Sequence, residues 1–240
     1  MSIKEERSGG LLTLTIANST KANALTESML NQLTRSVREA SEDESLRGVL
    51  LVAEGDRGFS AGMDTVQFDH DSSTRAYKTI STLGDVCRAI RESALPVAVG
   101  MQGYCIGGAL EIAASAEFRV GAKDSWYQMP ELRIGIPSVL ESVALPSLMG
   151  WTKATELMLT TESMSAIEMK ECGFLNAVVD RSEIGPALLN YMEKCTRNSR
   201  DVVAQQKRLF STWRNMHHEM AFEDSKKEFS LAFASKGEKE

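Results

Sequence analysis

The sequence predicts an α/β fold in which strands and helices alternate along the chain. Leu11 to Ile16 alternates apolar residues with threonine, the period-two pattern of a strand. A helical pattern follows, and then Val49 to Ala53 forms a short apolar run typical of a buried strand. Strand, helix and strand in this order form the unit that places two parallel strands side by side.

The first predicted helix begins after Thr26, whose hydroxyl is suited to accept a free amide at a helix N-terminus. Apolar residues then recur at helical spacing through residue 40: Met29, Leu30, Leu33 and Val37. The next expected elements are a glycine-rich loop over 55–64, a helix over 72–91, a buried strand over 96–101, a helix over 109–116, a strand over 118–121 and a loop and strand region over 126–137. From residue 139 the pattern is mainly helical, with breaks at Pro146, Gly150, Gly173 and Pro186. We expect an α/β body over 1–195 and a helical region over 196–240.

Composition sets broad limits on function. The 240 residues are 42% hydrophobic and 25% charged, which is ordinary for a globular chain large enough to bury a core. The net charge of -6 argues against a general nucleic-acid binder, which normally has a basic excess. Four cysteines without CxxC spacing, and three histidines without nearby ligands, predict no metal site. No signal peptide and no membrane span are expected, which favours a cytoplasmic protein, with an organelle matrix left open.

A glycine-rich turn before a predicted helix is the first candidate site. Gly107 and Gly108 follow a strand pattern and precede the helix formers of 109–116. The free amides and the positive dipole end of such a helix suit a phosphate or a developing oxyanion. A packing role for the glycine pair is the alternative, and the pair alone does not decide between them.

Two glutamates add candidate acid–base groups. Glu111 lies one turn into the predicted helix among apolar neighbours, and Glu131 follows Pro130. A solvated glutamate that favours the helix dipole is the alternative for Glu111. Two carboxylates that share one apolar pocket suit general acid–base catalysis, because burial separates their pKa values.

Taken together, these segments resemble the crotonase (enoyl-CoA hydratase/isomerase) superfamily in order and spacing over essentially the whole chain. The matching segments are Lys21 to Leu25, Phe59 to Asp64 (FSAGMD), Gly103 to Glu111 (GYCIGGALE), Met129 to Pro137 (MPELRIGIP) and Gly150 to Val179. The resemblance implies a ClpP/crotonase-like fold of repeated ββα units, with two nearly perpendicular sheets and a C-terminal helical region that forms homotrimers or dimers of trimers.

The resemblance also implies roles for individual residues. The backbone N–H groups of Met63 and Gly108 would form an oxyanion hole for the thioester carbonyl of an acyl-CoA substrate. Glu111 and Glu131 match the two glutamates of the hydratases, which hold a water molecule, and the second exchanges a proton with the α-carbon. The remaining implied substrate-binding positions are Lys21, Ala22, Ala61, Gly62, Asp64, Gly107, Ser138, Phe233 and Lys236. No metal or redox cofactor is implied, and coenzyme A is part of the substrate.

One segment departs from the family pattern. The glycine-rich turn of the type IPGAGG is here Ile136 to Glu141 (IPSVLE), one residue shorter. Ser138 replaces a glycine whose amide lies near the bound water. Glu141 adds a carboxylate that either faces the pocket, favouring thioester hydrolysis, or lies on a surface helix. The acidic loop over 67–74, which includes His70, is a candidate gate for the acyl pocket.

We therefore predict an enoyl-CoA hydratase of fatty acid metabolism. An enoyl-CoA isomerase, which often keeps only the carboxylate at the position of Glu131, and an acyl-CoA hydrolase are the alternatives within the family. A non-catalytic acyl-CoA-binding or scaffold member is the alternative of another class.

Overall fold

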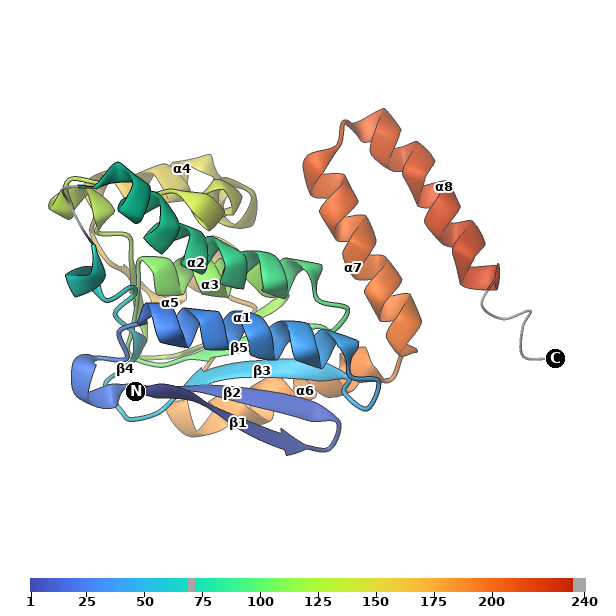
Figure 1. The fold of residues 1–240 in the computed structure, drawn as a ribbon, viewed down its shortest axis with the longest axis horizontal. Coiled ribbons are helices and arrows are strands. Elements are labelled where there is room, and N and C mark those ends of the chain that lie inside the picture. The colour runs from blue at the N-terminus through green and yellow to red at the C-terminus, as the bar shows by residue number, and fades with distance from the viewer. Residues whose placement is uncertain (69–71, 235–240) are drawn as a thin grey trace.

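The computed structural model of the protein describes residues 1–68 and 72–234, in which two sheets are packed with helices (Figure 1). Within these residues the larger sheet has the strand order β1-β2-β3-β5-β7-β10 and the smaller has the order β4-β6-β8-β9. The strands are β1 (Ser2–Ser8), β2 (Leu11–Ala17), β3 (Gly48–Ala53), β4 (Gly58–Ser60), β5 (Val97–Met101), β6 (Tyr104–Ile106), β7 (Phe118–Ala122), β8 (Trp126–Gln128), β9 (Met164–Ser165) and β10 (Ala177–Val179). The α-helices are α1 (Glu27–Glu42), α2 (Ser73–Glu92), α3 (Gly108–Ser115), α4 (Leu145–Thr160), α5 (Ala166–Glu171), α6 (Ile184–Thr196), α7 (Arg200–Asn215) and α8 (His218–Ala234). Short 3-10 segments are η1 (Ser19–Lys21), η2 (Thr65–Gln67), η3 (Glu131–Ile134), η4 (Leu140–Ala144) and η5 (Arg181–Glu183).

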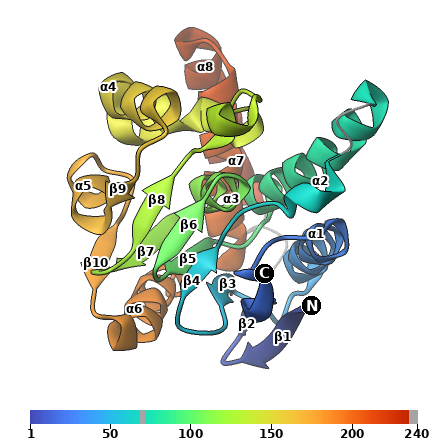
Figure 2. The same cartoon turned by 90° about the vertical axis from the view of Figure 1, so that its left-hand side faces the viewer.

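The repeated unit of the fold is two strands followed by a helix. In β3-β4-α2 and in β5-β6-α3, the first strand joins the larger sheet and the second joins the smaller one. Strands β3, β5 and β7 pair in parallel, as do β4, β6 and β8, which Figure 2 shows side by side. Successive units therefore place their second strands, and the turns that follow them, next to one another. The predicted α/β fold of ββα units is confirmed.

Local sequence patterns account for most of these elements. Thr26 caps α1, since its hydroxyl accepts the N–H of Met29 at 3.3 Å. The apolar stripe of α1 is buried against the larger sheet, and each such side chain contributes roughly 1.5–3 kcal/mol by leaving water. Pro146 and Pro186 lie in the first turns of α4 and α6, Gly150 interrupts α4 with non-helical φ and ψ, and Gly173 follows α5.

The structure contains strands that the sequence did not predict. The predicted loop over 55–64 contains β4, and the mainly helical C-terminal half contains β9 and β10. The charged segment over 2–8 forms β1, an antiparallel edge strand in which only Ile3 is buried. Strands of two or three residues, and edge strands with one solvated face, carry too little apolar pattern to be recognised before their sheet is known.

The helices α7 and α8 pack against each other at one end of the molecule, with α8 outermost (Figure 1). Lys207 of α7 is buried against the body, where its ammonium donates to the carbonyls of Ile90 and Leu95 and contacts Glu117 at 2.9 Å. This buried, fully partnered ammonium anchors α7 to the end of α2. Within the described part of the chain, no helix combines the length and the apolar character that crossing a bilayer requires.

Candidate active site

The first of two turns that build the site follows β4. Leu25 donates its N–H to the carbonyl of Gly62 at 2.8 Å, and Asp64 donates to the carbonyl of Leu25 at 2.9 Å. Met63 lies between these two bonds, and among the described residues its own N–H has no hydrogen-bond acceptor. The pairing with the segment before α1 therefore leaves one amide free, on the side away from Leu25.

Buried polar groups hold that segment in place. Asn23 has a positive φ of 53°, and its side-chain amide donates to the carbonyls of Glu54 and Gly58 at 3.0 and 3.1 Å. The hydroxyl of Ser60 donates to the carbonyl of Asn23 at 2.7 Å, and Ala61 donates its N–H to the carbonyl of Ala22. The first turn is thus fixed on both sides by hydrogen bonds to the main chain.

The second turn joins β6 to α3. Gly107 has φ 55° and ψ -124°, a conformation open essentially only to glycine, and its N–H donates to the carbonyl of Gln128 at 2.9 Å. Gly108 is the first residue of α3, and within the described chain its N–H has no acceptor. A free amide at the N-terminus of a buried helix, reinforced by the helix dipole, is suited to hold a negative oxygen.

The two turns approach each other closely because Gly62 has no side chain. A Cβ atom on Gly62 would lie 2.7 Å from the carbonyl oxygen of Ile106 and 3.4 Å from the nitrogen of Gly108. A Cβ atom on Gly108 would in turn lie 3.3 Å from Cγ of Met63. The free amides of Met63 and Gly108 therefore belong to neighbouring segments at one cavity, which both residues line.

Glu111 lies one turn into α3 and is only 3% exposed. Ser142 holds its carboxylate, with Oγ at 2.6 Å and the backbone nitrogen at 3.3 Å from Oε1. The pKa of Glu111 is raised to about 7: burial is the largest cause and the charge of Glu131 adds to it, while the hydrogen bonds from Ser142 lower it. The carboxyl group is thus poised to gain or lose a proton near neutral pH.

Glu131 begins η3 and faces the second turn. A Cβ atom on Gly107 would lie 2.7 Å from its Oε1, so the carboxylate lies against the glycine turn. Burial raises the pKa of Glu131, while its own backbone amide and the hydroxyl of Ser138, at 3.4 Å, lower it. Both carboxylates therefore line the cavity that the free amides also reach.

The rest of this cavity is mostly apolar. It is lined further by Ala61, Gly62, Thr65, Phe68, Ile80, Leu83, Ile106, Gly107, Pro130, Ile134, Ile136, Pro137 and Val139. Low polarity around a few hydrogen-bonding groups strengthens each electrostatic interaction inside. The arrangement is suited to polarise a carbonyl group and to move protons beside it.

Several other predicted binding residues do not line this cavity. Lys21 is exposed at the end of η1, beside Ala22, while Asp64 caps η2 by accepting the N–H of Val66 at 3.2 Å. Phe233 is exposed on α8, where its ring packs on Phe229, and it does not line the cavity. The predicted residues Lys236 and His70 lie outside the described residues, as do residues 69–71 of the proposed gate loop.

Both alternatives for Glu141 were wrong. The side chain is 4% exposed, so it is not on a surface, and it pairs with Arg91 of α2 and does not line the cavity. Sequence reasoning also missed Ser142 as the partner of Glu111. A serine inside a short 3-10 segment carries no local signal, and only the packing of η4 on α3 brings the two together.

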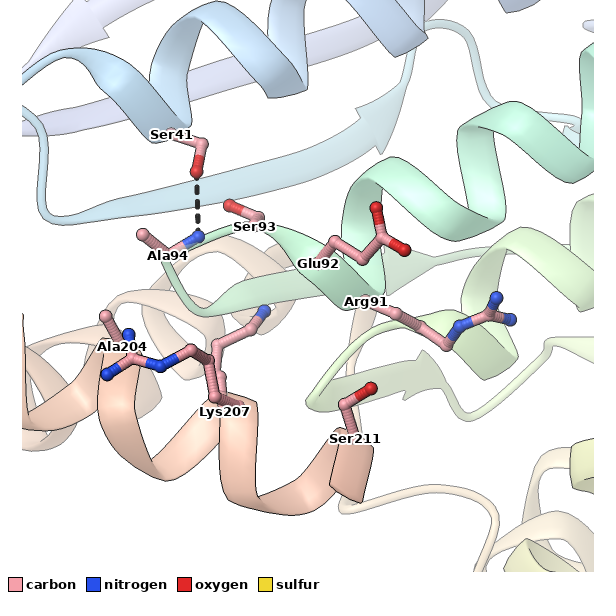
Figure 3. A pocket seen from close by; sticks show the side chains of 9 residues that line it. Ser41, Arg91, Glu92, Ser93, Ala94, Ala204, Lys207 and Ser211 are labelled. Carbon is pink, nitrogen blue, oxygen red and sulfur yellow. Dashed lines mark hydrogen bonds between the residues drawn. The ribbon is translucent and has the colours of Figure 1, made fainter. Parts of the chain in front are cut away.

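Another cavity lies between the end of α2 and α7 (Figure 3). Its cations already have carboxylate partners: Arg91 contacts Glu141, Lys207 contacts Glu117 and Arg208 contacts Glu228. We therefore assign it no ligand. Among residues 1–68 and 72–234, no three or more His, Cys, Asp or Glu side chains are grouped to hold a metal ion.

Two sheets built from ββα units, with glycine turns at the ends of β4 and β6, define a protein of the crotonase superfamily. The model of the enoyl-CoA hydratase/isomerase family matches residues 6–240, so the chain belongs to that family.

Named relatives agree with this assignment. The chain is 30% identical over 178 residues to cyclohexa-1,5-dienecarbonyl-CoA hydratase of Thauera aromatica, a match that spans 74% of this chain and 67% of that protein. It is 27% identical over 239 residues to crotonyl-CoA hydratase of Syntrophomonas wolfei, spanning 99% and 90%. Its fold matches the crystal structure of an enoyl-CoA hydratase of Mycobacterium smegmatis with a TM-score of 0.90 at 28% identity, over 96% and 90% of the two chains.

Proposed function

We propose that the protein adds water reversibly across the double bond of a 2-enoyl-CoA thioester. The observation that carries the proposal is one apolar cavity lined by two carboxylates, the buried Glu111 and the half-buried Glu131, beside two turns with free amides, at Met63 and Gly108. Relatives named as hydratases support the same reaction class.

In this mechanism the two amides hold the thioester oxygen. As water adds to the β-carbon, negative charge builds on that oxygen, and donors already aimed at it stabilise the transition state more than the ground state. Removing one such donor typically costs about 10²–10³ in kcat. The thioester of coenzyme A is thus the group that is activated, and the reaction needs no metal or redox cofactor.

The two carboxylates move the protons. Ionised Glu111 takes a proton from the attacking water, whose oxygen bonds to the β-carbon, and protonated Glu131 gives a proton to the α-carbon. The raised pKa values support this division: that of Glu111 is about 7, so its ionised form is populated at neutral pH, and burial raises that of Glu131, which favours its protonated form relative to an ordinary carboxylate. Exchange with solvent returns both carboxyl groups to their starting states.

The deciding experiment is to incubate the protein with a panel of enoyl-CoA thioesters of increasing chain length. Hydration removes the ultraviolet absorbance of the conjugated enone without releasing free thiol. Thiol release indicates the hydrolase alternative, and migration of a 3-enoyl double bond that does not require Glu111 indicates the isomerase. Binding of acyl-CoA without turnover of any thioester indicates a scaffold.

We further propose that the chain assembles as a homotrimer or a dimer of trimers through its helical tail. Large apolar side chains are exposed on α7 and α8: Phe210, Trp213, Met220, Phe222, Phe229, Leu231 and Phe233. An apolar surface of this kind is typical of an interaction face. Light scattering coupled to gel filtration measures the mass, and a monomeric mass at micromolar concentration contradicts the proposal.

A further inference from the structure

A single turn, residues 138–142, contacts both carboxylates of the cavity. Ser142 approaches Glu111 at 2.6 Å through its hydroxyl and at 3.3 Å through its backbone nitrogen. Ser138 approaches Oε2 of Glu131 at 3.4 Å. The position of this turn therefore determines which hydrogen bonds the two carboxylates receive.

An ion pair fastens the turn to α2. Glu141, between these two serines, is 4% exposed and contacts the guanidinium of Arg91, which is 34% exposed. Arg91 lies at the end of α2, and Figure 3 shows it extending away from Lys207 and Ser211 of α7. A buried carboxylate without its cation is strongly unfavourable, so the pair defines where Glu141 lies.

Packing adds a second constraint. Leu140 has a φ of 48°, a conformation that is strained for a leucine and persists only where its surroundings hold it. Its side chain packs on Gly84 of α2, where an added Cβ atom would lie 3.3 Å from Cδ2 of Leu140. Two neighbouring residues of the turn are thus held by the same helix.

We propose that Arg91 and Glu141, together with Leu140 on Gly84, hold the turn so that Ser142 orients Glu111 and keeps its carboxylate ionised. Ser142, Glu141 and Arg91 are positioning residues. The catalytic consequence of this arrangement rests on the proposed hydration reaction. The hydrogen bond itself is tested without turnover.

The other ionisable groups near Glu111 are few. Glu131 of η3 raises its pKa, and Cys87 of α2 stays a neutral thiol because burial raises its own pKa to about 12. The Arg91–Glu141 pair is neutral overall, and β6 adds only Tyr104 and Cys105. Ser142 is therefore the group that lowers the pKa of Glu111.

The first experiment compares Ser142→Ala with Ser142→Thr, which keeps the hydroxyl. Infrared spectroscopy follows protonation of Glu111 against pH through the carboxyl stretching band that Glu111→Gln removes. Because a hydrogen bond to a charged group is worth about one to two pKa units, Ser142→Ala raises the titration midpoint by that amount and Ser142→Thr leaves it near wild type. An unchanged midpoint in Ser142→Ala overturns the role of Ser142.

The second experiment removes the ion pair as a whole in Arg91→Met/Glu141→Gln. Deleting one cation and one anion leaves the net charge near Glu111 unchanged, so a raised midpoint reports displacement of Ser142. The matched control, Lys123→Met/Asp180→Asn, removes an exposed pair elsewhere and leaves the midpoint unchanged. When Ser142→Ala is added to the ion-pair variant, the titration midpoint of the combined variant equals that of Ser142→Ala alone. The two changes act through the same contact, so their effects are not additive.

Two results overturn the role of the pair: an unchanged midpoint in a folded Arg91→Met/Glu141→Gln protein, or shifts of the ion-pair variant and of Ser142→Ala that add in full when the changes are combined. If the double variant does not fold, Leu140→Gly tests the same turn, because glycine tolerates a positive φ while losing the contact with Gly84. A midpoint at the wild-type value in Leu140→Gly contradicts the proposal. Absence of hydratase activity in the wild type would overturn the proposed reaction and leave these midpoints interpretable.

Discussion

The two glycine turns and the turn over 138–142 face the same cavity but are held by different forces. Hydrogen bonds to main-chain atoms fix the glycine turns, and the close approach of Gly62 to Ile106 leaves no room for a side chain between them. Side chains hold the turn over 138–142, through Glu141 on Arg91 and Leu140 on Gly84. The backbone amides of the two glycine turns do not titrate, whereas the turn over 138–142 contacts carboxylates that do.

This difference separates two parts of the proposed chemistry. In the proposed mechanism the carbonyl oxygen is held by backbone amides, whose positions depend on backbone geometry. Water and protons are handled by groups whose charge depends on neighbouring side chains. The family pattern matches this chain in the glycine turns and departs from it in the turn over 138–142. Acyl activation and proton transfer can therefore be perturbed separately.

The largest expected effect comes from Glu111→Gln. The amide cannot accept a proton from water, so hydration falls about 10³-fold while acyl-CoA binding is retained. Enone absorbance measures the rate, and calorimetry with a saturated acyl-CoA measures binding. Retention of more than a tenth of the wild-type hydration rate contradicts the two-carboxylate mechanism and favours one that uses Glu131 alone.

Gly62→Ala disrupts the close approach of the two glycine turns. The new methyl group meets the carbonyl of Ile106 at a φ of 85°, so the two turns separate and kcat falls by about 10²–10³. Gly9→Ala is the control, since its φ is 57° and no atom lies within 4 Å of an added Cβ. It isolates backbone strain, which costs about 1–2 kcal/mol. Equal activity of the two variants contradicts the proposed oxyanion hole.

The pH dependence of stability sharpens the contrast, because the carboxylates titrate and the backbone amides do not. The pKa of Glu111 is about 7 in the folded protein, above its ordinary value of 4.5. Ionisation therefore opposes folding: the contribution is absent below pH 4.5 and lowers the free energy of unfolding by up to about 3 kcal/mol as pH rises through 7. Denaturant titrations from pH 4.5 to 8 show a steeper loss in wild type than in Glu111→Gln. Identical slopes contradict the raised pKa.

The smallest expected effect is that of Ser138→Gly, which restores the residue type of the family pattern. The hydroxyl lies 3.4 Å from Glu131, so its hydrogen bond is weak. The pKa of Glu131 rises slightly and kcat changes by less than about threefold, as measured by the pH profile of kcat/KM. A change above tenfold would show that Ser138 contributes more to the site than its distance indicates.

Local patterns were sufficient for the longer elements of the fold. The apolar alternation of β2 and the capped apolar stripe of α1 specify their structures within a few residues, because periodicity and capping act over one or two turns of chain. Short strands such as β4 and β9 were not predicted, since their pairing partners lie far along the sequence. The two glycine turns and the two glutamates were singled out from motif order, which reflects the repeated ββα unit.

By itself, the sequence determined the fold class, the glycine turns and the candidate carboxylates Glu111 and Glu131. Only the tertiary structure decided that Ser142 bonds to Glu111 and that Glu141 turns to Arg91 instead of the cavity. The reason is physical: backbone conformation is governed by neighbours within a few residues, whereas the partner of a buried charge is whichever group the packing of distant helices brings within hydrogen-bond distance.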